Sequence, residues 1–316
     1  MHEPWDPGQL ARLGEALRAT RYRFVTPTNA TVRRVNARAP DARARDAVDI
    51  FGWGRPMDGA QDAEATPWLA RVIEAGMARQ EGGRWRTALR AATLGPHLLF
   101  HTSGPGAADD AVFFGPDSYR FVHALRCELA AHPVDCKRAL DLGCGAGAGA
   151  LTLAALYPGA AVTATDINDK ALRLAGLNAA LAGLPNVSCR RSDLFADAGE
   201  GYDLIVANPP FIADPKGRTY RDGGDADGMG ICRRIVDGAL ERLAPGGALM
   251  LYTGVAITRG HDPLREHVQQ HPGAGGATLT YSELDPDIFG ELLATDAYRG
   301  ADRIAAVWLV LRKPSM

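Results

Sequence analysis

Apolar residues in the first third of the chain recur every three or four positions, which is the spacing of amphipathic helices. Such helices are predicted at 7–19, at 65–79 and from the Gly-Gly turn at 82–83 to about residue 92. Two short strands are predicted at 97–102 and 111–114. We therefore expect residues 1–110 to form a smaller, mainly helical N-terminal domain that recognises the substrate.

From about residue 115 the pattern changes, and short apolar runs alternate with helical periodicity. The predicted strands are 138–142, 161–166, 187–190, 204–207, 248–253, 277–282 and 304–311. One predicted helix ends near residue 157, and two others cover 168–182 and 228–243. This alternation predicts an α/β domain over residues 111–316, with a Rossmann-like, seven-stranded, mostly parallel sheet and helices on both faces. The last two strands, with no helical pattern between them, predict an antiparallel hairpin at one edge.

The composition is that of a globular protein. Of 316 residues, 46% are hydrophobic and 23% are charged, which excludes a largely disordered chain or a fibre. No apolar run approaches the length of a membrane-spanning helix, and the first residues do not resemble an export signal. The five cysteines form no Cys-x-x-Cys pair, and the histidines have no metal-ligand spacing. We therefore expect a cytoplasmic protein with no membrane contact, disulfide or metal site.

Arginine is concentrated near the N-terminus, although the formal net charge of the whole chain is only −2. Nine arginines and two acidic residues lie between Arg12 and Arg45. One interpretation is a set of solvated helical faces in a chain that uses little lysine. The other is a docking surface for RNA, the ribosome or another anionic partner. Binding that weakens steeply as salt rises would favour a nucleic acid.

A glycine-rich turn follows the first strand of the predicted sheet, in Ala139-Leu-Asp-Leu-Gly-Cys-Gly-Ala-Gly-Ala-Gly149. Glycines permit positive φ and let a ligand approach the backbone closely. In open α/β sheets, nucleotide-type ligands bind at this carboxyl edge. The spacing matches the Gly-x-Gly-x-x-Gly pattern of dinucleotide enzymes only approximately. By itself the turn indicates a nucleotide-type ligand without identifying it.

Three aspartates stand at successive strand ends and narrow the choice of ligand. Asp141 precedes the glycines, where a carboxylate would repel a pyrophosphate but suits an ammonium group. Asp166 can accept hydrogen bonds from both ribose hydroxyls, and Asp193 from an adenine amino group. Each aspartate alone is equally compatible with a helix cap or a turn. Together they indicate a ligand with an adenosine, an amino acid and no phosphate, a description that S-adenosyl-L-methionine fits.

The sequence Asn208-Pro-Pro-Phe211 directly follows the fourth predicted strand. Prolines lack the donor that a central strand needs, so Pro209 and Pro210 stiffen a turn at the carboxyl edge. The Asn208 Oδ1 atom and the Pro209 carbonyl oxygen can accept hydrogen bonds from a planar nitrogen, and Phe211 can stack on a planar amide or base. Methyl transfer from a sulfonium requires alignment of this kind more than a strong base. These four residues are the candidate catalytic residues, and a purely structural turn is the alternative.

On these motifs, residues 115–312 resemble a class I S-adenosylmethionine-dependent methyltransferase of the Asn-Pro-Pro-Tyr/Phe group. Within this group the chain is most similar to the protein-(glutamine-N5) methyltransferases of peptide release factors. Those enzymes carry an Arg-Pro-Asp/Glu-Thr segment where this chain has Gly115-Pro-Asp-Ser-Tyr119. They also carry a Gly-Gly-x-Asp-Gly stretch, which Gly223-Gly-Asp-Ala-Asp-Gly228 resembles. The chain departs from the group by Gly115 in place of arginine and by Phe211 in place of tyrosine.

The resemblance implies a cofactor, a reaction and a set of site residues. The cofactor is S-adenosyl-L-methionine, and the expected contacts to it are Asp117, Asp141, Gly143, Gly145, Gly147, Asp166, Ile167, Asp193, Leu194 and Asn208. The implied reaction is methylation of a planar nitrogen, in the first place a glutamine amide of a protein substrate. Two alternatives stay open: methylation of an exocyclic amine in RNA or DNA, and a small-molecule reaction of secondary metabolism that uses the cofactor with or without methyl transfer.

A long polar loop over 214–228 is expected to form the rim of the substrate pocket. Arg218, Tyr220 and Arg221 of this loop either contact an anionic or planar substrate or are merely solvated. Tyr119 and Phe211 complete the expected set of substrate contacts.

Overall fold

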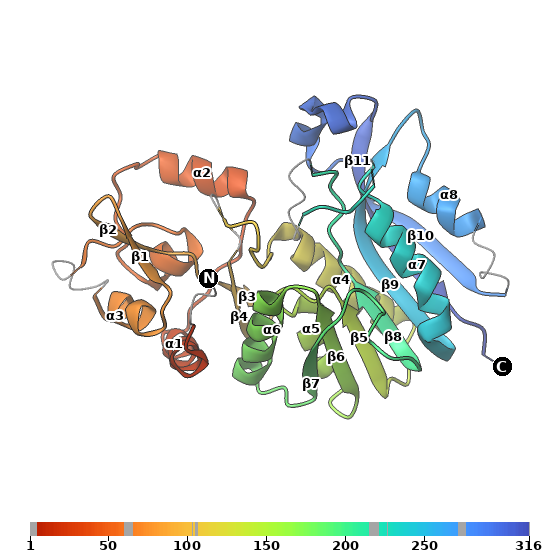
Figure 1. Cartoon of the computed structure of the whole chain (residues 1–316), viewed down its shortest axis with the longest axis horizontal. Coiled ribbons are helices and arrows are strands. Elements are labelled where there is room, and N and C mark those ends of the chain that lie inside the picture. The colour runs from red at the N-terminus through yellow and green to blue at the C-terminus, as the bar shows by residue number, and fades with distance from the viewer. Residues whose placement is uncertain are drawn as a thin grey trace.

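The C-terminal part of the chain is built on one seven-stranded sheet (Figure 1). The computed structural model describes residues 5–59, 66–102, 104, 107–214, 221–225, 227–270 and 276–315. The expected substrate contacts Arg218 and Tyr220 lie outside these residues. In spatial order the strands are β10 (Thr278–Asp285), β11 (Arg303–Arg312), β9 (Leu243–Ile257), β8 (Tyr202–Ala207), β5 (Arg138–Leu142), β6 (Ala161–Asp166) and β7 (Val187–Arg191).

Five neighbouring strands of this sheet, from β9 to β7, are parallel. Strand β11 runs antiparallel to both β9 and β10. The predicted α/β fold and its C-terminal antiparallel hairpin are therefore confirmed. The chain enters the sheet at β5, moves outward to β7 and then returns to β8 on the other side of β5. Folds of this kind bind their ligands at such a reversal, which here lies at the carboxyl ends of β5 and β8.

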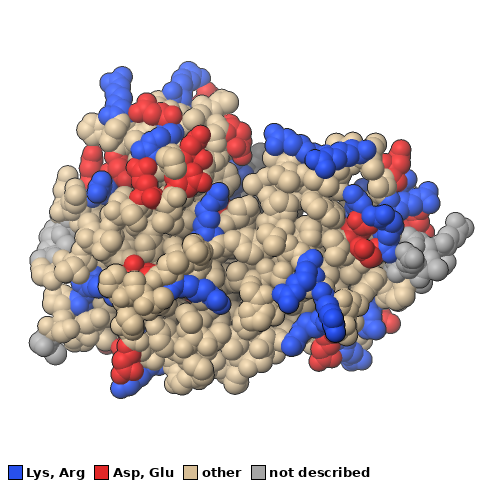
Figure 2. Space-filling model, turned by 180° about the vertical axis from the view of Figure 1, so that it is seen from behind, with Lys and Arg blue, Asp and Glu red and all other residues tan. Residues whose placement is uncertain are grey.

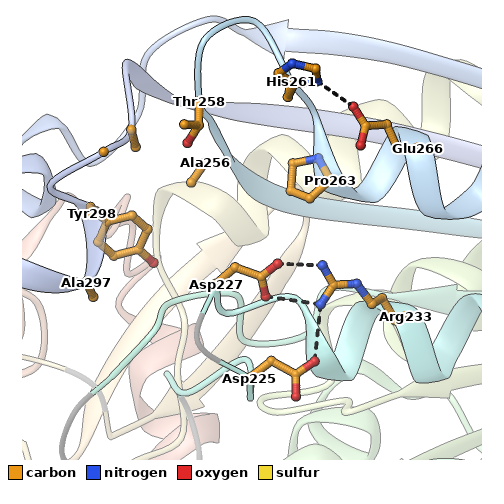
Figure 3. A pocket seen from close by; sticks show the side chains of 12 residues that line it. Asp225, Asp227, Arg233, Ala256, Thr258, His261, Pro263, Glu266, Ala297 and Tyr298 are labelled. Carbon is orange, nitrogen blue, oxygen red and sulfur yellow. Dashed lines mark hydrogen bonds and ion pairs between the residues drawn. The ribbon is translucent and has the colours of Figure 1, made fainter.

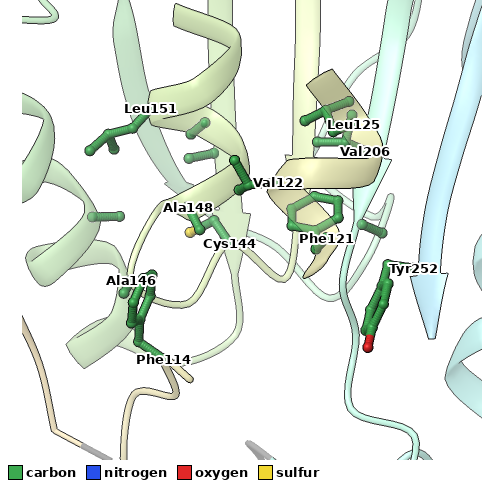
Figure 4. Close-up of a cluster of buried hydrophobic side chains, with 14 of the residues drawn as sticks. Phe114, Phe121, Val122, Leu125, Cys144, Ala146, Ala148, Leu151, Val206 and Tyr252 are labelled. Atoms are coloured by element: carbon green, nitrogen blue, oxygen red, sulfur yellow. The ribbon is translucent and has the colours of Figure 1, made fainter. Parts of the chain in front are cut away.

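Helices cover both faces of the sheet. α4 (Pro116–Ala131), α5 (Ala148–Leu156) and α6 (Asp169–Ala182) pack beside one another, and α7 (Gly230–Arg242) and α8 (Pro263–Gln270) form a second group (Figure 1). Right-handed crossovers between parallel strands place these two groups on opposite faces. Phe121 and Leu125 of α4 are buried in the same apolar cluster as Val206 of β8, close to the carboxyl edge (Figure 4). Burial of each such side chain contributes roughly 1.5–3 kcal/mol.

The N-terminal region mixes helices with short strands. Its helices are α1 (Pro7–Ala19), α2 (Asn29–Ala37), the short π-helix Val48–Gly52 and α3 (Thr66–Glu74). Its strands are β1 (Ala78–Glu81), β2 (Arg84–Thr87), β3 (Arg90–Leu94) and β4 (His97–His101), paired as two antiparallel hairpins. The predictions of helices at 7–19 and 65–79 and of a strand near 97–102 are confirmed in their essentials.

Two predictions for this region are wrong. The segment predicted to be helical as far as residue 92 forms β2 and β3, because Gly82 and Gly83 both have positive φ (+57° and +79°) and close a tight hairpin turn. The segment 111–114 is not a strand. Its Val112 is bonded to Thr102, the residue after β4, whose N–H donates to the Val112 carbonyl oxygen at 3.1 Å while its Oγ1 accepts from the Val112 N–H at 2.9 Å.

The N-terminal region packs directly on α6 of the sheet domain. A Cβ atom at Gly14 of α1 would lie 2.6 Å from Leu181 Cδ1 of α6, so glycine at this position leaves room for the Leu181 side chain between the two helices. The Arg18 guanidinium donates to the Leu181 carbonyl oxygen at 2.6 Å. Buried apolar residues form a single cluster that runs from α1 to β11. The division of the chain near residue 110 therefore stays a prediction.

Candidate active site

The glycine loop between β5 and α5 adopts a conformation that its glycines require. Gly143, Gly145 and Gly147 all have positive φ, at +64°, +52° and +87°. A Cβ at Gly147 would lie 2.9 Å from Leu151 Cδ1, so this glycine allows the loop to pack closely into α5. A Cβ at Gly143 would have no atom within 4 Å. The backbone at Gly143 is therefore open at the sheet edge, where a ligand can approach it.

Asp141 lies beneath this loop and is only 2% exposed. Its Oδ2 atom accepts a hydrogen bond from the Ala150 N–H in the first turn of α5, at 2.7 Å. A Cβ at Gly149 would lie 2.7 Å from the Asp141 Oδ1 atom, so glycine at this position leaves room for the carboxylate. Burial raises the pKa of Asp141 to about 7, although the Ala150 N–H opposes the shift. The Asp141 carboxylate thus links the end of β5 to the first turn of α5.

Asp166, at the end of β6, ties that strand to the glycine loop. Its Oδ2 atom accepts from the Gly145 N–H at 3.0 Å, and its Oδ1 atom accepts from the Asn168 N–H at 2.9 Å. Burial raises the pKa of Asp166. Each carboxylate oxygen can accept a further hydrogen bond. The adjoining Ile167 is 44% exposed, which is unusual for a large apolar side chain and leaves an apolar surface at this edge.

The third predicted strand-end acid is differently placed. The Asp193 side chain is 64% exposed and pairs with the Arg234 guanidinium of α7 at 3.2 Å. The next residue, Leu194, is partly buried and has a positive φ of +48°. The structure therefore brings Asp141 and Asp166 together around the glycine loop, and it directs Asp193 toward α7.

Asn208 stands at the carboxyl end of β8 and begins the Asn-Pro-Pro-Phe turn. Asn208 is partly buried, and the next residue, Pro209, is buried. Within the part of the chain that the structure describes, the Asn208 carboxamide forms no hydrogen bond. Its oxygen and nitrogen are therefore available to a ligand. Because Pro209 and Pro210 have no N–H, the turn presents carbonyl acceptors at these positions without backbone donors.

Residues 221–223 and Gly228 clamp this turn. The Ile212 N–H donates to the Arg221 carbonyl oxygen at 3.1 Å, and the Gly223 N–H donates to the Ile212 carbonyl oxygen at 2.9 Å. A Cβ at Gly223 would lie 2.8 Å from Phe211 Cα, and a Cβ at Gly228 would lie 2.6 Å from the Phe211 carbonyl oxygen. These two glycines are therefore required because the two stretches of backbone touch. Of the expected substrate contacts, Arg221 belongs to this clamp.

The Phe211 side chain is an anchor in this structure. It is 8% exposed, and its ring centroid lies 5.8 Å from that of Phe289. A Cβ at Gly254 of β9 would lie 2.4 Å from Phe211 Cε2, so the ring packs tightly on that strand. The ring faces are covered by the protein, which fixes the turn and leaves little surface for stacking on a substrate.

Two further expected contacts lie at the start of α4. The Asp117 carboxylate is buried, accepts from the Tyr252 hydroxyl at 2.8 Å and pairs with Arg120 at 3.3 Å. Burial raises the pKa of Asp117. The Tyr119 hydroxyl accepts a hydrogen bond from the Thr26 N–H at 3.1 Å. Asp117 therefore links α4 to β9, and Tyr119 links α4 to the N-terminal region.

A hollow of about 520 Å³ opens near the clamp, between the start of α7 and the end of β9 (Figure 3). Arg233 reaches across its floor and pairs with Asp225 and Asp227. Burial would raise the pKa of Asp227, but the hydrogen bonds from Arg233 outweigh it and lower the pKa. Tyr298, on the other wall, accepts from the Ala213 N–H at 2.9 Å. Tyr298 therefore both lines the hollow and bonds the chain just after the Asn-Pro-Pro-Phe turn.

Several residues around the site escaped prediction from the sequence. The structure adds these to the site: Asn178, Tyr252, Gly254, Phe289 and Tyr298. An amide on the apolar face of the predicted helix at 168–182 was a usable signal for Asn178. No local signal marked the other four, because their contacts come from distant segments.

Part of the Arg12–Arg45 cluster has structural contacts. Arg23 donates to the Gly95 carbonyl oxygen, and Arg43 and Arg45 pair with Asp58 and Asp49. Figure 2 shows the basic side chains of the face it presents in separate groups, interspersed with acidic and uncharged surface. No group of three metal-ligating side chains, and no helix with the length and apolar character to cross a membrane, occurs among the described residues.

The parallel sheet with a glycine loop at its central strand is the fold of Rossmann-like methyltransferases, and comparison with known proteins gives the same class. The family profile described as the Methyltransferase small domain matches residues 123–272. The structure of Trm5b from Pyrococcus abyssi has a similar fold, with a TM-score of 0.50 and 15% identity over 74% of this chain and 62% of that one.

Relatives at higher identity define the family. A release factor glutamine methyltransferase of Cereibacter sphaeroides is 41% identical over 253 residues, which cover 73% of this chain and 85% of that protein. A ribosomal protein uL3 glutamine methyltransferase of Bradyrhizobium diazoefficiens is 39% identical over 141 residues, or 40% of this chain and 43% of that protein. The chain spans about half the length of most curated relatives that it matches. The chain belongs to the release factor glutamine methyltransferase family, and the resemblance predicted from its motifs is confirmed.

Proposed function

We propose that the protein transfers a methyl group from S-adenosyl-L-methionine to the side-chain amide nitrogen of a glutamine in a protein substrate. The observation that carries this proposal is the hydrogen-bonding capacity of Asn208, which is held on a rigid turn at the sheet edge without a partner in the described chain. The names of the two relatives support the choice of group. They specify different proteins, a release factor and ribosomal protein uL3, but the same residue, glutamine.

The residues at the sheet edge fit this cofactor. The backbone at Gly143 is open to a ligand, and the exposed Ile167 offers an apolar surface for a planar base. The carboxylate oxygens of Asp166, which accept from the Gly145 and Asn168 N–H groups, can each accept a further hydrogen bond from a ribose hydroxyl. Asp141 acts through the loop that it supports. When bound, the cofactor supplies an electrophilic methyl group on a positively charged sulfur.

The protein's own task is to present the substrate nitrogen correctly. The lone pair of an amide nitrogen is delocalised, so the nitrogen is a weak nucleophile. Asn208 Oδ1 and the Pro209 carbonyl oxygen accept its N–H groups and so fix the direction from which the nitrogen reacts. The stiffness of the two prolines and the packing of Phe211 against Gly254 hold these acceptors in place. Acceptors placed in advance favour the positive charge that develops on the nitrogen.

Identification of the product tests this proposal. The purified protein is incubated with isotopically labelled S-adenosyl-L-methionine and with a purified peptide release factor or fractionated cell extract. Mass spectrometry of the labelled material then locates the methyl group. We expect it on a glutamine of a protein. Label in RNA or DNA, with binding that weakens steeply as salt rises, would favour the base-methylating alternative. Label in free metabolites would favour a small-molecule enzyme.

The proposed location of the reaction is the cytoplasm. All five cysteines are unpaired thiols, which accords with a reducing compartment. The proposed partner is a protein with an accessible glutamine, and the N-terminal region is the proposed recognition domain.

A further inference from the structure

Asn178 is a completely buried amide in α6, and both of its polar atoms are in use. Its Oδ1 atom accepts from the Phe100 N–H at 2.8 Å. Its Nδ2 atom donates to the Phe100 carbonyl oxygen at 2.9 Å and to the Ala146 carbonyl oxygen at 2.9 Å. Phe100 belongs to β4 of the N-terminal region, and Ala146 belongs to the glycine loop. One side chain therefore joins three segments that are far apart in the sequence.

The contact with β4 imitates strand pairing. β3 and β4 form a two-stranded sheet, so the Phe100 N–H and carbonyl need a partner outside it. The Asn178 carboxamide supplies one donor and one acceptor to that residue, as a neighbouring strand would. The other buried residues of α6 are small or apolar: Ala171, Leu174, Ala175, Ala179 and Leu181. Burial of an amide costs free energy unless its polar atoms are hydrogen-bonded. The role of Asn178 therefore lies in the backbone groups that its hydrogen bonds hold in place.

The contact with Ala146 holds the glycine loop between two of its glycines. Ala146 lies between Gly145 and Gly147, both of which have positive φ and no side chain to hold them. The early part of the loop is fixed from β6, by the Asp166 carboxylate and by a hydrogen bond from the Cys144 N–H to the Thr165 carbonyl oxygen. The bond from Asn178 orients the later part. The shape of the loop therefore depends both on the end of β6 and on Asn178 of α6.

We propose that Asn178 is a positioning residue that couples the cofactor loop to the N-terminal region. It holds the loop in the shape that receives the cofactor, and the same carboxamide docks β4. This inference rests on the proposed function, because it takes the glycine loop as the cofactor site. Coupling between two sites is reciprocal. Cofactor binding therefore tightens β4 on α6, and loosening of β4 weakens cofactor binding.

A pair of variants on the same helix tests the coupling. Asn178→Leu keeps the approximate volume and removes all three hydrogen bonds. Leu181→Ala is the matched control, because Leu181 packs against Gly14 of α1, whereas Asn178 is bonded to Phe100 of β4, and because Leu181 has no contact with the glycine loop among those described. Calorimetric titration with S-adenosylhomocysteine is performed well below the unfolding temperature of both variants. We expect Asn178→Leu to raise the Kd by about tenfold or more, the scale of a lost buried hydrogen bond.

The control and the kinetics separate positioning from general destabilisation. Leu181→Ala should change the Kd by less than about twofold, which is under 0.5 kcal/mol. In the methyl-transfer assay, Asn178→Leu should raise the KM for the cofactor more than it lowers kcat. Wild-type affinity in Asn178→Leu, or an equal loss in both variants, would overturn the coupling. Failure of the wild-type protein to bind the nucleoside would instead overturn the proposed function.

Hydrogen exchange on the wild-type protein gives a second test that does not depend on a variant folding. Saturation with S-adenosylhomocysteine should slow exchange of the Phe100 amide, although Phe100 lies outside the sheet domain. The control is the Met57 amide, which donates to the Trp85 carbonyl oxygen within the N-terminal region. Its exchange should not change. Unchanged exchange at Phe100 in a protein that binds the ligand contradicts the inference.

Discussion

Replacement of Asn208 by alanine separates the chemistry of the site from its stability. The carboxamide has no partner among the described residues, so its loss leaves no protein group unsatisfied. We expect the free energy of unfolding to stay within about 0.5 kcal/mol of wild type. The cofactor contacts proposed at Asp166 and Gly143 lie on other strands, so affinity for S-adenosylhomocysteine should also survive.

Turnover should fall because one of the two proposed acceptors for the substrate nitrogen is gone. A hydrogen bond to a group that gains charge contributes about 1.5–3 kcal/mol, which corresponds to about a 10- to 150-fold loss in kcat. The remaining Pro209 carbonyl cannot orient both N–H groups, so we expect a value at the upper end of this range. The assay measures transfer of labelled methyl from the cofactor to the purified protein substrate, with kcat and KM determined separately.

Asn208→Asp is the matched control for this prediction. Its side chain has the same shape and keeps an acceptor oxygen, so it should retain more activity than Asn208→Ala. Equal activity of Asn208→Ala and the wild-type protein would refute the acceptor role. A parallel loss of cofactor affinity and turnover would show that Asn208 serves the cofactor rather than the substrate nitrogen.

Three further predictions concern the cofactor, the clamp and pH. Asp166→Ala should weaken binding of S-adenosylhomocysteine by about 1–3 kcal/mol, the scale of lost charged hydrogen bonds, and calorimetry that shows no change would contradict the assignment. Gly228→Ala should destabilise the protein by about 1–3 kcal/mol in urea unfolding, because its Cβ would meet the Phe211 carbonyl oxygen at 2.6 Å. Gly260→Ala has a similar positive φ but open space around it, so it should cost less. Asp141 has its pKa raised from 3.8 to about 7 by burial, so the folded state holds a proton that the unfolded state releases. The free energy of unfolding of the wild type relative to Asp141→Asn should therefore fall as pH rises from 3.8 to about 7, by at most about 1.4 kcal/mol per pH unit. A difference that is constant across this window would show that Asp141 is ionised throughout.

The sheet domain could be predicted because its signals are local. Strand and helix periodicity is repeated within each element, and the glycine loop and the Asn-Pro-Pro-Phe turn each depend on the conformational range of neighbouring residues. The segment over residues 84–94 shows the limit of such reasoning. Its alanines, arginines and leucines suit a helix, but the Gly-Gly turn pairs β2 with β1, and β4 provides a partner for β3.

The sequence by itself determined the α/β class, the order of the elements and the residues that gather at the carboxyl edge. Only the tertiary structure decided the direction of the polar side chains there. Asp141 points beneath α5, Asp193 pairs with Arg234, and Asn178 reaches Phe100, which lies 78 residues away along the chain. A polar group takes the direction in which it finds a partner once water is excluded. Those partners come from distant segments, so no pattern along the chain specifies them.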